Sequence, residues 1–139
     1  MNVLLDTNIV LDVLLDRQPF SEPAVSLMSK VENAQFNGYL CATTLTTLHY
    51  LLAKSLDRDK AIQSIRALIS LFAIAPVNRV VLEDALVTQF SDFEDAVLEQ
   101  SALHAGVNYI ITRNLKDFKN SKVPTASPVD FLAMLAARH

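Results

Sequence analysis

The first eight residues, Met-Asn-Val-Leu-Leu-Asp-Thr-Asn (1–8), decide the fold of this 139-residue chain. Their apolar run stops abruptly at Asp6, which is typical of a buried strand in a parallel sheet. Apolar residues then recur at helical spacing between 9 and 14, and Pro19 follows that helix. We therefore predict a strand over 2–5 that delivers Asp6 to its carboxyl end, with a helix directly after it.

The same alternation of short apolar strands and amphipathic helices continues to the end of the chain. Further strands are predicted at 39–42, 72–75, 109–112 and 123–126, and helices at 21–31, 43–52, 57–71, 80–90, 93–104 and from 128. We expect Asp57 and the threonines from Thr43 onward to cap helices, and Gly106 to follow the end of one. The pattern predicts a three-layer α/β/α sandwich around a mostly parallel sheet of four to five strands, with functional sites beyond the strands' carboxyl ends.

Composition limits the possible classes of protein. A hydrophobic fraction of 51% with 19% charged residues suits one domain over residues 1–139 with a well-buried core, and it excludes a disordered chain. Twelve basic and fifteen acidic residues give a net charge of −3, which argues against a broad basic surface for nucleic acid. Any nucleic acid should therefore bind locally, at a defined site. Two glycines leave little room for a dinucleotide or Walker motif, and neither occurs.

The compartment is predicted from cysteine usage and from the N-terminus. Cys41 is the sole cysteine, lies in a predicted buried strand and cannot form an intrachain disulfide, so a reducing environment fits best. The N-terminal apolar run is broken by Asp6 and is too short for a secretory signal or a spanning helix. We predict a cytoplasmic protein that does not interact with a membrane.

Acidic and amide side chains follow several predicted strands or begin the adjacent helices. They occur as Asp6 with Asn8, as the group Asp92 to Asp95, and as Asn114 with Asp117. Helical geometry places Asp92, Asp95 and Glu99 within roughly 60° of one another on one face. Carboxylates crowded in this way repel one another unless a cation neutralises them, and oxygen-rich sites suit Mg²⁺ or Mn²⁺.

Purely structural roles are open for the same residues. Asp6 can be a helix N-cap, and the acidic residues at 92–95 can interact with a helix dipole. Asn114 and Asp117 can hold a turn, and Arg113 and Lys116 can be ordinary surface charges. His49 and His104 lack the spacing of a zinc site. The combination of the acidic groups at the expected sheet edge is what favours a metal site.

Three segments together resemble the PIN-domain family of metal-dependent nucleases. They are Val3–Asp12 (VLLDTNIVLD), Asp92–Ala96 (DFEDA) and Ile110–Asn114 (IITRN) with the following Asp117-Phe118. Their order and spacing span almost the whole chain, and the family's fold is the α/β/α sandwich. The resemblance implies an endoribonuclease of the VapC toxin type, with Asp6 and Asp95 at two of the acidic positions. Thr47 occupies the position where the family has a glutamate, and Asn114 that of the last acidic residue.

The resemblance also implies roles for the candidate residues and for partners. Asp6, Asp92, Asp95 and Asp117 would be the catalytic residues and the ligands of Mg²⁺ or Mn²⁺, with Asp92 compensating for the missing glutamate. The residues expected to support the metal or contact substrate are Thr7, Asn8, Thr47, Glu99, Arg113, Asn114 and Lys116. An RNA substrate, a small antitoxin protein and a homodimer are the expected partners, and the generous apolar faces of the N-terminal helices also favour pairing.

Two other functions are compatible with these residues. Thr47 and Asn114 favour a degenerate PIN domain that binds RNA or a protein without cutting. Asp6 after a strand also suits a phosphatase of the haloacid-dehalogenase type, although Asn8 stands where that family has a second acidic residue.

Overall fold

A five-stranded parallel sheet forms the centre of the molecule, in a computed structural model that describes residues 1–138. The strands lie in the order β3-β2-β1-β4-β5 and are β1 (Asn2–Leu5), β2 (Asn37–Cys41), β3 (Ala73–Ala75), β4 (Tyr109–Ile111) and β5 (Thr125–Ala126). Strand β1 is central, with Leu4 in register with Tyr39 of β2 and Ile110 of β4. The predicted parallel sheet is therefore confirmed, with its first strand in the middle.

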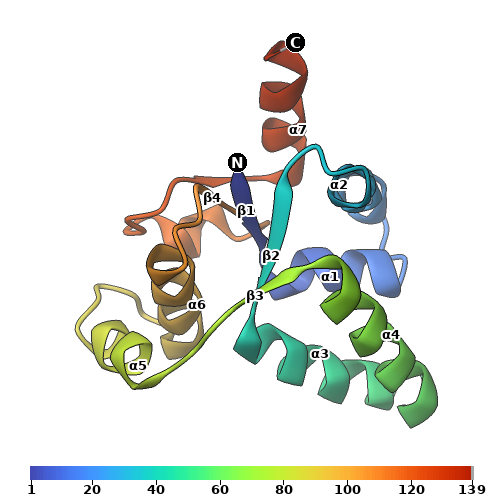
Figure 1. Cartoon of the computed structure of the whole chain (residues 1–139), viewed down its shortest axis with the longest axis horizontal. Coiled ribbons are helices and arrows are strands. Elements are labelled where there is room, and N and C mark those ends of the chain that lie inside the picture. Colours follow the sequence, from blue (N-terminus) through green and yellow to red (C-terminus); the bar gives the residue numbers. More distant parts are fainter. Residues whose placement is uncertain (139) are drawn as a thin grey trace.

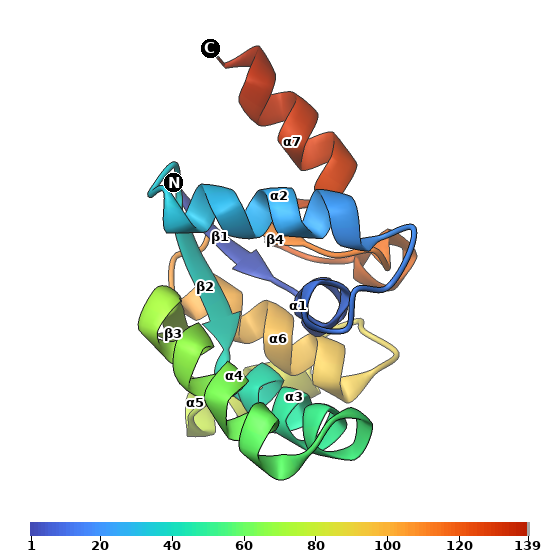
Figure 2. The ribbon, with the colours of Figure 1, turned by 90° about the vertical axis from the view of Figure 1, so that its right-hand side faces the viewer.

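Helices cover both faces of the sheet (Figure 1). They are α1 (Thr7–Leu14), α2 (Ser21–Glu32), α3 (Ala42–Ser55), α4 (Arg58–Leu71), α5 (Arg79–Leu86), α6 (Phe93–His104), α7 (Pro128–Ala137) and a 3-10 turn, Leu115–Phe118. The α5–α6 pair lies on one side of the strands, and α1 to α4 lie on the other (Figure 1). The view in Figure 2 shows α7 beside one end of α2 and extending away from the other helices. This arrangement is the three-layer α/β/α sandwich that the sequence predicts.

The alternating side chains of β1 connect the two halves of the core. Val3 and Leu5 pack into the larger apolar cluster, together with residues of α1, α2, α3, α4 and α7. Leu4 faces the opposite side and packs with Leu98 of α6 and Ile110 of β4. These three apolar side chains of β1 are completely buried, which explains why residues 3–5 form an unbroken apolar run.

Several element boundaries differ from those predicted. Helix α5 ends at Leu86, so residues 87–90 of the predicted helix form a connection instead, and β5 spans two residues rather than four. Helix α3 begins at Ala42 after Cys41, with no side-chain cap, so the predicted threonine cap is wrong. Asp57 does cap α4, accepting a hydrogen bond from the Lys60 amide at 2.7 Å.

The two glycines occupy their positions for different structural reasons. A Cβ atom at Gly38 would lie 2.7 Å from the Phe72 ring and 2.8 Å from Val31, so β2 needs glycine where it passes these side chains. Gly106 has a φ of +75° just after α6, which confirms its predicted place beyond a helix end. Within residues 1–138, no helix has the length and apolar character needed to cross a membrane.

Candidate active site

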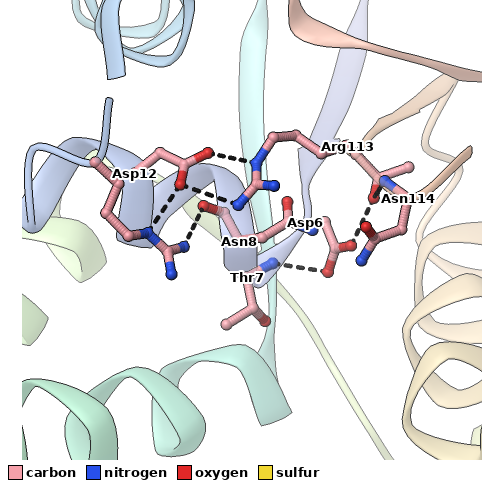
Figure 3. Close-up of polar contacts among 8 residues, drawn as sticks. Asp6, Thr7, Asn8, Asp12, Arg113 and Asn114 are labelled. Atoms are coloured by element: carbon pink, nitrogen blue, oxygen red, sulfur yellow. Dashed lines mark hydrogen bonds and ion pairs between the residues drawn. The ribbon is translucent and has the colours of Figure 1, made fainter. Parts of the chain in front are cut away.

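Asp6 lies at the carboxyl end of the central strand and is fixed by both adjoining elements. Its amide donates to the Ile111 carbonyl at 2.9 Å, which continues the pairing of β1 with β4. One carboxylate oxygen accepts from the Thr7 amide at 2.7 Å, and the other accepts from the Thr112 hydroxyl at 2.8 Å (Figure 3). Asp6 is therefore the N-cap of α1, and it is held rigidly by the sheet at the same time.

An acidic cleft of about 320 Å³ opens at this edge of the sheet. Its lining comprises Asp6, Thr7, Asn8, Leu11, Arg17, Asp92, Glu94, Asp95, Arg113 and Asn114. Asp92 caps α6 by accepting from the Asp95 amide at 2.9 Å, and both side chains line the cleft with Asp6. The structure thus brings together the two predicted groups of carboxylates, from the end of β1 and the start of α6.

The crowding of carboxylates changes their proton affinity. Burial and then the negative charges of Asp6, Asp92, Asp117 and Glu94 raise the pKa of Asp95 to about 7. Burial also raises the pKa of Asp6, although the hydrogen bonds from Thr112 and Thr7 act in the opposite direction. Negative charge therefore accumulates in the cleft at the cost of electrostatic repulsion, which a bound cation would relieve.

The smaller polar residues support the cleft from neighbouring elements. The Thr7 hydroxyl lies 3.0 Å from that of Thr44, which connects α1 to α3. The Thr47 hydroxyl donates to a carboxylate oxygen of Glu94 at 3.4 Å. Glu94 lines the cleft, whereas Thr47 does not. The backbone amide of Asn114 donates to the Thr112 hydroxyl at 3.0 Å. Asn114 therefore helps to orient Thr112, whose hydroxyl donates to Asp6.

Two predicted site residues lie at the margin of this cleft. Asp117 is exposed on the 3-10 turn and does not line the cleft, yet its charge contributes to the raised pKa of Asp95. Lys116 is exposed on the same turn and is also absent from the cleft lining. The predicted convergence therefore holds for three of the four aspartates, while Asp117 approaches from outside.

The structure places Glu99 elsewhere, in contrast to the prediction that it supports the metal. Its side chain is 1% exposed and lines a separate cavity of about 500 Å³. The carboxylate accepts from the Lys122 amide at 2.7 Å and from the Gln100 side chain at 2.6 Å. Glu99 shares a face of α6 with Asp95 but lies one turn further along the helix, where the Lys122 amide binds its carboxylate.

We predict that Glu99 supports stability and not the acidic cleft. Replacing Glu99 with alanine leaves the Lys122 amide and the buried Gln100 side chain without their acceptor, which should cost about 2–4 kcal/mol of unfolding free energy. Urea denaturation measures this loss. The stabilisation by millimolar Mn²⁺ should be the same in the variant and the wild type, and its selective disappearance would return Glu99 to the metal site.

The sequence reasoning did not assign a role to Glu94, Asp12 or Arg17. Glu94 lines the cleft from the first turn of α6, where its proximity to Asp92 and Asp95 could have suggested it. Asp12 is completely buried and bonded to two arginines, Arg17 and Arg113. In the sequence, the sign that Asp12 belongs near the site is that it follows Asn8 by four residues, which places both on one face of α1.

The donor atoms of the cleft suit a hard divalent cation. Carboxylate oxygens from Asp6, Asp92, Glu94 and Asp95 surround the cleft. The side-chain oxygen of Asn8 is buried and has no hydrogen-bond partner in the part of the chain that the structure describes. Among residues 1–138, no three acidic, histidine or cysteine side chains lie close enough to enclose an ion by themselves. The oxygen-only donor set itself is of the kind that Mg²⁺ prefers, and Mg²⁺ commonly keeps several waters.

Similarity to known proteins identifies the family of this chain. The fold and site define a class of α/β/α domains with an acidic cleft at the carboxyl edge of a parallel sheet. Residues 2–116 match the family model described as PIN domain, and the chain belongs to this family, as the sequence motifs indicated.

Individual relatives share the length and fold of the chain. It is 23% identical over 134 residues to ribonuclease VapC1 of Aquifex aeolicus (strain VF5), covering 93% of this chain and 92% of the relative. The structure of FitAB bound to an IR36 DNA fragment has a TM-score of 0.71 at 21% identity, covering 91% and 94% of the two chains. VapBC2 from Rickettsia felis, bound to a promoter DNA fragment, also has a TM-score of 0.71, at 14% identity over 91% and 98%.

Proposed function

We propose that this protein is a metal-dependent endoribonuclease of the VapC toxin type. The observation that carries the proposal is the cleft at the end of β1, where the rigidly held Asp6 faces the carboxylates at the start of α6. The family and the similarity to ribonuclease VapC1 support the same activity. The net charge of −3 argues against a broad basic surface, so an RNA strand would bind locally, at this cleft.

In this proposal Asp6, Asp92, Glu94 and Asp95 hold Mg²⁺ or Mn²⁺. When bound, the ion makes water a stronger nucleophile near neutral pH and neutralises charge that develops on the phosphodiester. Glu94 supplies the carboxylate that Thr47 does not, because the two side chains meet between α3 and α6. Asp117 lies close enough to add negative charge without lining the cleft.

The chain's own residues orient these groups and handle protons. The Thr7 amide and Thr112 hydroxyl keep the Asp6 carboxylate in one orientation, so little reorganisation is needed when an ion and a phosphate bind. A pKa of about 7 leaves the Asp95 carboxyl of the metal-free cleft partly protonated at neutral pH, so a cation that binds there displaces a proton from this side chain. Asn8 contributes its unpartnered side-chain oxygen at the same edge.

The activity is tested directly by incubating the purified chain with a labelled single-stranded RNA. We expect endonucleolytic products in millimolar Mg²⁺ or Mn²⁺ and none after addition of EDTA, because the proposed mechanism relies on the bound ion to activate water. Recovery of cleavage when Mn²⁺ is restored in excess separates chelation from denaturation. Cleavage that persists in EDTA would contradict the proposed mechanism.

A second function is favoured by the open arrangement of the carboxylates. No three of them enclose an ion among the described residues, which suits a degenerate domain that binds RNA without cutting. RNA binding without cleavage in either metal, with the metal shown to be bound, would support this alternative over the nuclease.

The proposal includes a small antitoxin protein as partner and a homodimer as the assembly. A solved structure similar to this chain, at a TM-score of 0.68 and 21% identity, is described as a toxin-antitoxin complex from Klebsiella pneumoniae, which supports a protein partner for this chain. Exposed apolar side chains on and after α5, notably Leu86 and Val87 at 71% and 81% exposure, provide surface for association.

A further inference from the structure

Asp12 is a fully buried carboxylate in the middle of α1, and both of its oxygens bind arginines. One oxygen accepts from Nε of Arg17 at 2.9 Å and from Nη2 of Arg113 at 3.2 Å. The other accepts from Nε of Arg113 at 2.7 Å. Figure 3 shows the Asp12 carboxylate facing the Arg113 guanidinium on the side of α1 that carries Asn8. Asp12, Arg17 and Arg113 are called the arginine clamp below.

Each arginine of the clamp is also held by a second contact. Arg17 donates through Nη2 to the Asn8 carbonyl at 3.2 Å, in the first turn of α1. The Arg113 guanidinium lies over the Phe20 ring at 3.9 Å from its centroid. The two guanidinium groups are therefore fixed in place at the connection that follows α1 and at the end of β4.

Both arginines face the acidic cleft and are open to solvent. Arg17 and Arg113 line the cleft with Asp6 and Asp95, and their side chains are 39% and 26% exposed. Within residues 1–138, each guanidinium commits two of its five N–H groups to these hydrogen bonds. The remaining donors are available to an anion in the cleft.

The arginine clamp carries one more positive charge than negative charge. One carboxylate and two guanidinium groups give −1 + 2 = +1, so the clamp presents a fixed positive charge beside the carboxylates. Both guanidinium groups are partly open to solvent, so the extra positive charge is accessible to an anion in the cleft. Arginine also matches phosphate oxygens through paired N–H donors, which lysine cannot do.

We propose that Arg17 and Arg113 bind a backbone phosphate of the RNA strand next to the cleaved bond, and that Asp12 is the positioning residue that aims both of them. This inference rests on the proposed ribonuclease function and names a substrate contact within it. The bound strand then lies between the carboxylates of β1 and α6 on one side and the clamp on the other. The sequence leaves Arg113 either a substrate contact or an ordinary surface charge, and its fixed orientation toward the cleft favours the substrate contact.

The test measures affinity for a labelled single-stranded RNA by fluorescence anisotropy in EDTA, where no cleavage is expected, using the full chain. Arg17→Gln and Arg113→Gln should each weaken binding by about 5- to 10-fold. Each should also reduce the slope of log affinity against log salt by about 0.7, the value for one lost phosphate contact on a single strand. Arg79→Gln is the matched control, since it removes the same charge from an exposed residue of α5.

Asp12→Asn is the decisive variant, because a charge effect and a positioning effect would change the affinity for RNA in opposite directions. Loss of a negative charge beside the RNA should tighten binding by electrostatics alone, whereas loss of the acceptor that aims both arginines should weaken it about 5- to 10-fold. Thermal unfolding establishes that the variant is folded. If it is not, Arg17→Lys and Arg113→Lys replace it: weaker binding at unchanged net charge supports the proposal, and wild-type affinity overturns it.

The outcomes separate this inference from the proposed function. Wild-type protein that cleaves RNA, with clamp variants that bind like Arg79→Gln or an Asp12→Asn variant that binds as tightly as wild type, overturns the clamp alone. Wild-type protein that neither binds nor cleaves RNA removes both proposals together.

Discussion

Asp6→Asn should abolish RNA cleavage, with a loss of about 10²–10³-fold or more in kcat. The substitution removes the negative charge at the most rigid carboxylate of the cleft and keeps the size of the side chain. The amide oxygen can still accept from the Thr7 amide, and its NH₂ group can donate to the Thr112 hydroxyl, which replaces the two existing hydrogen bonds. Single-turnover cleavage in Mn²⁺ measures the loss.

Two comparisons make this result specific to the cleft. Asp59→Asn makes the same chemical change at an exposed position in the first turn of α4, and we expect it to cleave at the wild-type rate. Thermal unfolding of Asp6→Asn should show a folded protein, because burial already disfavours the charged form of Asp6. A folded Asp6→Asn variant with undiminished, metal-dependent cleavage would exclude Asp6 from the reaction.

The sheet and the position of Asp6 could be predicted because they follow from a single local pattern. A strand buried on both faces needs an unbroken apolar run, and Asp6 ends that run at the edge where parallel strands expose their carboxyl ends. The start of α6 could be predicted in the same way, since Asp92 has the position and chemistry of an N-cap. Local sequence therefore specified both halves of the cleft.

Other parts of the site depend on contacts between distant segments, which periodicity does not reveal. The Asp12 carboxylate meets Arg113 across 101 positions of sequence, and nothing in α1 alone indicates that partner. Glu99 shares a helical face with Asp95, yet the loop that carries Lys122 supplies its partner and separates it from the cleft. Thr47 is predicted to stand in place of a carboxylate, but only the fold shows the Glu94 side chain beside it.

Asp95→Asn should stabilise the metal-free protein at pH 8, because the folded state there carries a repelling charge. The pKa of Asp95 is about 7 in the folded state and 3.8 as its ordinary value, so the folded state holds this proton more tightly. The associated stability is present below about pH 4 and is lost as the pH rises through 7. We expect a gain of about 1–2 kcal/mol at pH 8, reduced from the full electrostatic value because the side chain is half open to water.

Thermal unfolding at two pH values with and without Mn²⁺ measures this effect. The variant should melt about 3–6 °C above the wild type at pH 8 in EDTA, and the difference should disappear near pH 4. Millimolar Mn²⁺ should stabilise the wild type by neutralising the crowded carboxylates, and it should stabilise Asp95→Asn less because one ligand charge is gone. Asp59→Asn controls for the change in net charge. An equal Mn²⁺ shift in the wild type and Asp95→Asn would place the ion away from Asp95, since a cation bound there must gain most where the repulsion is largest.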